Sequence, residues 1–322
     1  MIRRLLRNSY RLAGGHALSR HKSRHGLRIL MYHRFAGRDR HLEAQCQHIR
    51  RYYNPVSMDQ VADWLAGIAL LPERAVAVTV DDGYRDFLEV AWPVFARYEI
   101  PAMVYVVSGF ASGDCWLWWD LLAEHLLQSA ARRIRLPYLA GQPEWEAAST
   151  PLKRRQVAER LAYALMKVPD DLRRAYIKAL PAATGIQLPV NPPPAYAGMN
   201  WQEICGLAEA GAHFGAHTRT HPILSRLSGE AEQQKEMAAS RDELAGVLGR
   251  PVRHFCYPVG GLDEFNSASV AAAKNTGFAT ATTTVRGLND RSSDPFQLNR
   301  LGVEPDQDPL YFAELLAGVR PI

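Results

Sequence analysis

Long apolar runs are missing from this 322-residue sequence. The longest nearly apolar stretch covers residues 100–111 and is interrupted by Pro101 and Gly109, whereas a helix that crosses a membrane needs about 20 apolar residues. We therefore predict no transmembrane segment. Hydrophobic residues nevertheless make up 47% of the chain and charged residues 22%, a balance that is typical of a globular protein and excludes a largely disordered one.

Cysteine is scarce, and the four cysteines are far apart in the sequence: Cys46, Cys115, Cys205 and Cys256. This spacing provides neither a CxxC motif nor the dense disulfide framework of a small secreted domain. The N-terminus, MIRRLLRNSYRL, is basic but lacks the continuous apolar core of a secretory signal peptide. We therefore expect free thiols and a cytoplasmic location.

Acidic residues are absent from positions 1–38, which carry ten arginines and lysines. The net charge of the whole chain is +5, so the rest of the chain sums to −5 and the basic balance comes from this end. In a helix, four apolar side chains would lie opposite the arginines: Ile2, Leu5, Leu6 and Leu12. The pattern fits a helix on an anionic membrane surface, and it fits a solvated basic tail equally well.

We accordingly treat residues 1–27 as a basic leader, with residues 1–20 as the candidate for peripheral contact with the inner membrane face. No nucleic-acid-binding motif accompanies the charge, so we expect no nucleic-acid partner. The sequence contains no signal for an oligomeric state.

Short apolar runs alternate with helix-like segments along most of the chain; the runs cover residues 28–33, 75–82, 100–108, 213–218, 252–258, 278–284 and 296–303. This alternation predicts βα units around a parallel sheet or barrel. The segment 115–197 interrupts it with helical patterns and a proline-rich connector. We interpret this segment as a mostly helical insertion beside the mouth of the barrel.

Two short motifs follow the apolar runs. The motif TVDDGYRDF contains Asp81 and Asp82. The motif GAHTRTHP contains His217 and His221, which stand four residues apart. One carboxylate and two imidazoles make three protein ligands and leave a fourth position open, which is the catalytic zinc pattern. The other carboxylate would then be free to act as a base. Each motif also has a plainer interpretation: an Asp-Gly turn with a helix cap, and a histidine pair that arises by chance.

The sequence resembles the polysaccharide deacetylases with a NodB homology domain, carbohydrate esterase family 4. Three motifs of that family have counterparts here, at residues 79–83 (TVDDG), 217–222 (HTRTHP) and 255–260 (FCYPVG). The resemblance implies an α/β fold, a distorted and incomplete (β/α)7 barrel, over residues 28–320 with the insertion at 115–197.

The resemblance also implies a role for each matching residue. Asp82, His217 and His221 would hold a divalent metal, most often Zn2+, and Asp81 would be the general base. The backbone N–H of Val259 would be the second oxyanion donor, and its neighbours Tyr257 and Pro258 would complete the oxyanion and substrate-binding segment.

Three positions depart from the family pattern. Cys256 stands where the family often has an arginine that supports the base, and Arg300 stands where it has a histidine that protonates the leaving amine. We hypothesise that His33, in an early Tyr-His motif, supplies the acid and that Arg300 steadies Asp81. The alternatives are a strand-end histidine bonded to the backbone, and an arginine in an ordinary surface ion pair.

The third departure is the absence of a D-x-x-x-W motif after Gly260, so the tryptophan of the acetyl pocket would have to come from elsewhere. Trp118 and Trp119 are candidates for it. With Trp116, they could equally pack in the core. Acetyl and formyl specificity are both left open.

The resemblance implies a metal-dependent hydrolase that removes the N-acetyl group from an N-acetylhexosamine in a glycan, in exopolysaccharide, lipopolysaccharide or lipid-linked oligosaccharide metabolism. Two alternatives stay open. One is a catalytically inactive glycan-binding protein of the same fold, and the other is a deformylase of a lipid-linked amino sugar.

Overall fold

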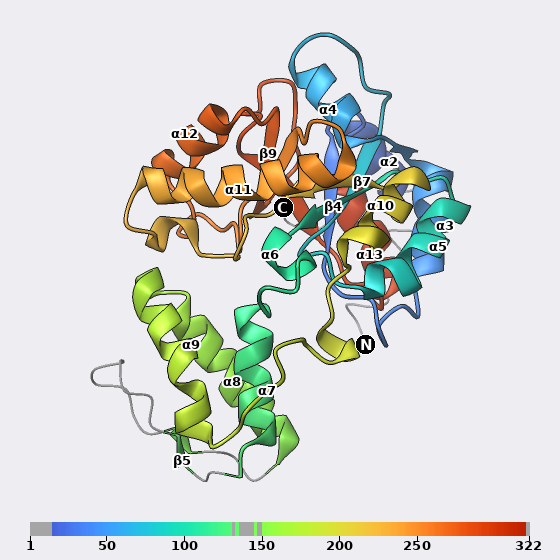
Figure 1. Cartoon of the computed structure of the whole chain (residues 1–322). Helices are drawn as coiled ribbons and strands as arrows, with labels where there is room; N and C mark the ends of the chain where they lie inside the picture. The colour runs from blue at the N-terminus through green and yellow to red at the C-terminus, as the bar shows by residue number, and fades with distance from the viewer. Residues whose placement is uncertain (1–14, 131–132, 135–144, 147–149, 320–322) are drawn as a thin grey trace.

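The computed structural model describes residues 15–130, 133–134, 145–146 and 150–319 (Figure 1). The predicted amphipathic stretch of the leader falls mostly on residues 1–14 and so lies outside the described residues. Among the helices of the described part, none is long and apolar enough to cross a membrane.

Seven parallel strands form a closed ring in the order β1-β10-β9-β8-β7-β4-β3. They are β1 (Arg28–Tyr32), β3 (Ala75–Val80), β4 (Ala102–Val106), β7 (His213–Ala216), β8 (His254–Cys256), β9 (Thr280–Arg286) and β10 (Leu298–Gly302). The ring closes where β1 pairs with β3, from Arg28 opposite Val76 to Tyr32 opposite Val80. A short strand, β2 (Asn54–Pro55), is added to β3 outside the ring. The predicted (β/α)7 barrel is confirmed, and its distortion includes a register shift between β9 and β10.

The strands are apolar on both faces because both faces are covered. All six residues of β3 are buried, and alternate side chains join different clusters. Val76, Val78 and Val80 pack outward against the helices, whereas Ala75 and Ala77 pack inward with residues of other strands. The same alternation turns polar side chains of β10 and of the loop after β3 into the barrel.

Helices cover the outside of the barrel (Figure 1). In chain order they are α3 (Leu42–Tyr52), α4 (Met58–Leu65), the π-helix η1 (Phe87–Ala91), α5 (Trp92–Arg97), α6 (Ser108–Ala111), α10 (Trp201–Glu209), η3 (Leu224–Arg226, a 3-10 turn), α11 (Glu230–Leu248), α12 (Ser267–Thr276) and α13 (Pro309–Ala317). The helix α2 (Gly15–Lys22), within the predicted leader, contacts α13. Reciprocal side-chain caps begin several of these helices; at α10, Asn200 and Glu203 cap each other's backbone N–H groups.

Between α6 and α10, the chain forms a lobe of its own, drawn in green in Figure 1. It contains α7 (Trp118–Gln128), β5 (Arg133–Ile134), β6 (Trp145–Glu146), α8 (Pro151–Leu165), α9 (Asp170–Thr184) and η2 (Pro194–Tyr196). Its helices share an apolar core that also takes in Ile223, a residue of the loop after β7. The lobe is therefore packed against the loop that carries the histidine motif. The division of the chain into a leader, a barrel and an insertion stays a prediction.

Candidate active site

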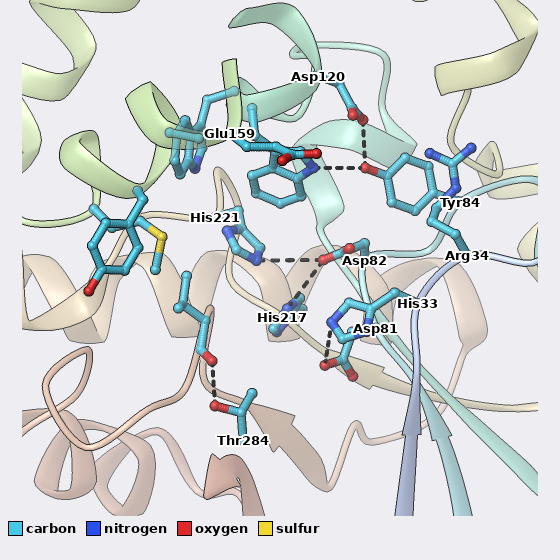
Figure 2. Close-up of a pocket in the computed structure, with 16 residues that line it drawn as sticks. His33, Arg34, Asp81, Asp82, Tyr84, Asp120, Glu159, His217, His221 and Thr284 are labelled. Carbon is cyan, nitrogen blue, oxygen red and sulfur yellow. Dashed lines mark hydrogen bonds and ion pairs between the residues drawn. The ribbon is translucent and has the colours of Figure 1, made fainter. Parts of the chain in front are cut away.

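The polar residues singled out in the sequence meet at one end of the barrel. Asp81 and Asp82 follow β3, His217 follows β7, and His33 follows β1. Because the carboxyl ends of parallel barrel strands share one face, these side chains come together there. They line a cleft of about 540 Å³, whose far wall is formed by helices α7 and α8 of the lobe (Figure 2).

Asp82, His217 and His221 form a compact ligand set. The Nε2 atoms of both histidines lie 3.5 Å from Oδ1 of Asp82, and all three residues are buried. Asp82 and His221 have left-handed backbones, with φ of 74° and 54°. Such strain in non-glycine residues is common at functional sites, where the surrounding fold imposes it.

The His217 ring is held by a hydrogen bond at Nδ1, whereas Nδ1 of His221 has no partner among the described residues. Nδ1 of His217 donates to the carbonyl oxygen of Cys256 at 2.7 Å, which directs Nε2 toward Asp82. Burial, together with the nearby His217, lowers the pKa of His221 to about 3, so its ring is neutral. A buried carboxylate and two imidazoles are donors that suit Zn2+. The residues present therefore fit a divalent cation.

Asp81 is held by a buried arginine. Nη1 of Arg300 lies 2.7 Å from Oδ1 of Asp81, and Nη2 lies 2.7 Å from Oδ2. Both residues are buried, with exposed fractions of 0% for Arg300 and 2% for Asp81. Burial acts to raise the pKa of Asp81, but Arg300 outweighs it and holds that pKa well below its usual range. A surface ion pair, the alternative for Arg300, does not describe this arrangement.

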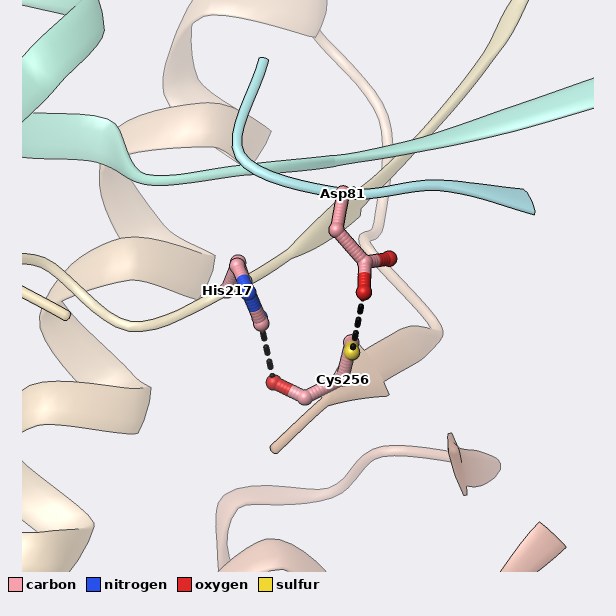
Figure 3. Close-up of side chains that lie close together, drawn as sticks. All are labelled: Asp81, His217 and Cys256. Carbon is pink, nitrogen blue, oxygen red and sulfur yellow. Dashed lines mark hydrogen bonds between the residues drawn. The ribbon is translucent and has the colours of Figure 1, made fainter. Parts of the chain in front are cut away.

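Cys256 lies beside Asp81 and His217 (Figure 3). Its Sγ accepts from Nη2 of Arg300 at 3.1 Å and lies 3.6 Å from Oδ2 of Asp81. Asp81, His217 and Cys256 are close enough to form a second ligand set. Both carboxylate oxygens of Asp81 are already bound by Arg300, however, so the set with Asp82 is the better metal site.

His33 lies on the open side of Asp81. Its Nε2 is 3.6 Å from Oδ2 of Asp81, and its side chain is 45% exposed. The ring makes no hydrogen bond to the backbone of the described residues, so the alternative of a backbone-bonded histidine has no support there. His33 therefore lines the cleft and lies beside the carboxylate of Asp81.

The third motif places only one of its three candidate residues on the cleft. Val259 lines it with a left-handed backbone, φ 62°, and its N–H makes no hydrogen bond within the described part of the chain. Tyr257 is fully buried in the outer core, where its hydroxyl donates to the carbonyl of Phe296 at 2.9 Å. Pro258 is also buried and contributes no side chain to the cleft. The Tyr257 side chain therefore does not reach a substrate.

Tyr84 and Asp120, which were not predicted as site residues, form a network with Trp119. The hydroxyl of Tyr84 donates to Asp120 at 2.5 Å and accepts from Nε1 of Trp119 at 3.1 Å. The Trp119 ring packs edge-on against His221, with 4.6 Å between ring centroids. Burial raises the pKa of Asp120 to about 6. This network contacts His221, one of the three candidate metal ligands, from the side of the lobe.

The three tryptophans of the lobe have different surroundings. Trp118 and Trp119 line the cleft, as the acetyl-pocket interpretation requires. Trp116 does not; its Nε1 donates to the carbonyl of Val190 at 2.9 Å, and its ring packs on Tyr196. Packing is therefore the role of Trp116, while Trp118 and Trp119 form part of the wall.

The model of the polysaccharide deacetylase family matches residues 183–281, which include both histidine ligands and the third motif. The YxkH protein of Bacillus subtilis (strain 168) is 27% identical over 119 residues, which cover 37% of this chain and 41% of that protein. The poly-beta-1,6-N-acetyl-D-glucosamine N-deacetylase of Escherichia coli (strain K12) is 39% identical over 51 residues, 16% of this chain and 8% of that protein. The chain thus spans less than half the length of these relatives.

Solved structures share the fold over most of the chain. The Streptococcus pyogenes deacetylase PplD, solved in complex with acetate, superposes with a TM-score of 0.59 at 18% identity, covering 91% of this chain and 99% of that one. IcaB from Ammonifex degensii superposes with a TM-score of 0.58 at 19% identity, covering 90% and 97%. At these identities, the likeness establishes the fold.

Proposed function

We propose that this chain, whose residues 183–281 match the model of the polysaccharide deacetylase family, is a metal-dependent hydrolase that removes the N-acetyl group from an amino sugar in a glycan. The observation that carries this proposal is the pairing of two buried groups at the mouth of the barrel. The ligand set Asp82, His217 and His221 lies beside the ion pair of Asp81 and Arg300, and the cleft opens onto both.

A divalent cation, which we propose to be Zn2+, supplies Lewis acidity toward the amide carbonyl and toward water when it is bound by Asp82, His217 and His221. The protein's own residues manage the protons. Asp81, kept ionised and oriented by both nitrogens of Arg300, accepts a proton from the attacking water. The free N–H of Val259 donates to the oxygen on which negative charge develops.

The leaving amine needs a proton, and His33 is placed to deliver it. Its Nε2 lies 3.6 Å from Oδ2 of Asp81, and a shift to hydrogen-bond distance in the substrate complex lets the proton taken from water pass to His33 and then to the amine nitrogen. The carbon–nitrogen bond of the amide breaks as the carbon–oxygen bond to water forms, and the products are acetate and a free amino sugar. The second proton of the water leaves the new carboxyl group, which becomes acetate, and is taken up by the amine, which becomes an ammonium group.

The two departures in the later motifs, which raised the possibility of an inactive protein, compensate for each other here. The arginine that binds the proposed base, Asp81, is Arg300 of β10. The family often has this arginine on β8, at the position of Cys256 in this chain. The small thiol leaves the room that the guanidinium occupies. A catalytic role for the pair is therefore the better supported proposal.

For the substrate, we propose a glycan that contains N-acetylhexosamine, in exopolysaccharide, lipopolysaccharide or lipid-linked oligosaccharide metabolism. One relative is named for poly-beta-1,6-N-acetyl-D-glucosamine, which makes this polymer the first to test. We also propose a cytoplasmic protein whose residues 1–20 contact the inner membrane face.

Acetate release tests the proposal. The purified protein, loaded with Zn2+, should release acetate from N-acetylglucosamine oligosaccharides with β-1,6 and β-1,4 linkages, and the Asp82→Asn variant should release far less. An assay for formate on the N-formyl analogues separates deacetylation from deformylation. Tight glycan binding by zinc-loaded protein with no release of acetate or formate would identify an inactive binder.

A further inference from the structure

Helix α8 of the lobe presents a second face to the cleft. One face packs in the core of the lobe through Val157, Ala158, Leu161 and Leu165. Four other residues, Glu159, Ala162, Tyr163 and Met166, line the cleft instead. Their spacing of three, four and seven residues places them on one side of a helix. The lobe thus contributes a continuous strip of side chains to the same cleft as the metal ligands.

Tyr163 is the most prominent residue of this strip. Its side chain is 64% exposed, which is unusual for a large aromatic residue. The ammonium group of Lys167 lies 5.3 Å from the ring centroid and also pairs with Glu264 at 3.0 Å. Since Glu264 belongs to the loop after β8, which also carries Val259, this ion pair ties the end of α8 to the oxyanion segment. The ring is therefore held at the cleft.

Two polar groups on the same wall have no partner. Glu159, which Figure 2 shows on the opposite side of His221 from Thr284, is exposed to solvent and makes no ion pair or hydrogen bond with the described residues. Nε1 of Trp118 is buried and has no acceptor among them, and the side chain is only 7% exposed. A buried donor without a partner is costly, so an acceptor supplied by a ligand would account for it.

An exposed aromatic ring, an unpaired indole N–H and an unpaired carboxylate together suit a sugar ring. The apolar C–H face of a pyranose covers an aromatic ring, and its hydroxyls serve as both donors and acceptors. A purely apolar ligand would leave the Trp118 N–H without an acceptor and would place no donor beside the exposed Glu159 carboxylate. A sugar therefore fits this wall better than an alkyl chain.

We propose that Tyr163, Glu159 and Trp118 form a second sugar subsite, which binds a neighbour of the amino sugar that is deacetylated. The enzyme then selects an oligosaccharide over a monosaccharide, and it does so through residues outside the 183–281 segment that the family model matches. This inference rests on the proposed function, since it assigns part of the same substrate.

The test compares chain lengths. The full-length protein is assayed for kcat/KM of acetate release from N-acetylglucosamine and from its tetrasaccharide, as wild type, Tyr163→Ala, Tyr163→Phe and Leu152→Ala. Leu152 is a matched control, because it is 67% exposed on the same helix but does not line the cleft. We expect the ratio of tetrasaccharide to monosaccharide kcat/KM to fall about tenfold in Tyr163→Ala, mainly through KM. The Phe variant and the Leu152 variant should keep the wild-type ratio.

A wild-type ratio in Tyr163→Ala would overturn the subsite. So would an octyl glycoside of N-acetylglucosamine that is cleaved as well as the tetrasaccharide and loses as much in Tyr163→Ala, because that result indicates an apolar subsite. If the wild type releases no acetate from any substrate, the proposed function fails separately. Calorimetric binding of the tetrasaccharide then decides the subsite: weaker binding to Tyr163→Ala supports it, and equal binding contradicts it.

Discussion

The barrel side and the lobe side of the cleft differ in how their polar groups are satisfied. On the barrel side, Asp81 and Arg300 are buried and bonded to each other through two contacts, and His217 is oriented by a backbone carbonyl. On the lobe side, Tyr163 is exposed, and Glu159 has no partner within the described residues. The groups that we propose hold protons and a cation are fixed by the fold, whereas the groups that we propose select a ligand are left open to it.

This contrast predicts that substitutions on the barrel side abolish chemistry, whereas those on the lobe side alter substrate choice. The largest effect should come from the base. Asp81→Asn removes the proton acceptor, and we expect kcat for acetate release to fall about a thousandfold or more. Zinc content measured by mass spectrometry should stay at the wild-type level, because the ligand set is intact. Turnover within tenfold of wild type would exclude Asp81 as the base.

His33 should give the next largest effect. His33→Ala removes the donor for the leaving amine, and we expect kcat to fall about a hundredfold on an N-acetyl sugar. An N-acetyl arylamine needs less help to leave, so the loss should be much smaller on that substrate. Equal losses on both substrates would remove the acid role from His33.

A substitution of Arg300 should change both the free energy of unfolding and the pH dependence of kcat/KM. Arg300→Gln leaves the Asp81 carboxylate buried without its partner, and we expect a loss of about 3–5 kcal/mol in the free energy of unfolding. Because Arg300 holds the pKa of Asp81 low, its removal should move the acidic limb of the kcat/KM profile to higher pH. An unchanged acidic limb in a folded variant would show that Arg300 does not keep Asp81 ionised.

A substitution of Asp120 should have the smallest effect, and that effect is on stability. Asp120 lies where the lobe side meets the barrel side, because it accepts a hydrogen bond from Tyr84. Its folded pKa of about 6 lies above that of an exposed aspartate, so the folded state binds more protons than the unfolded state between about pH 4 and pH 6. The stability of the wild type should therefore fall by about 2 kcal/mol as the pH rises through this window. Asp120→Asn keeps an acceptor for Tyr84 and should lose this dependence. Parallel curves of melting temperature against pH for the two proteins would contradict the assignment.

Much of the barrel side could be predicted from the sequence because its signals are local. The apolar runs at 75–82 and 213–218 end at the site residues, and strands of a parallel barrel bring their carboxyl ends together. The closure of the ring was not evident, because it depends on pairing of β1 with β3 across an intervening helix pair. The burial of Tyr257 follows from alternation with Cys256, which points inward, but the motif alone did not reveal it.

The lobe side could not be predicted in the same way. Helix α8 has apolar residues on two faces, and only the packing of α7 and α9 decides which face is buried and which lines the cleft. The contact of Trp119 with His221 joins elements about a hundred residues apart, so no local pattern indicates it. The role of Arg300 beside Asp81 was predicted from the sequence. The complete burial of the Arg300 side chain is evident only in the structure.

Zinc titration tests the central proposal most directly. Protein stripped with a chelator is titrated with ZnCl2, and bound zinc and acetate release from the N-acetylglucosamine tetrasaccharide are measured in the same samples. The proposal predicts that activity rises in proportion to bound zinc up to about one ion per chain, and that His221→Ala binds less zinc and stays inactive. Full acetate release by the metal-free protein would contradict it.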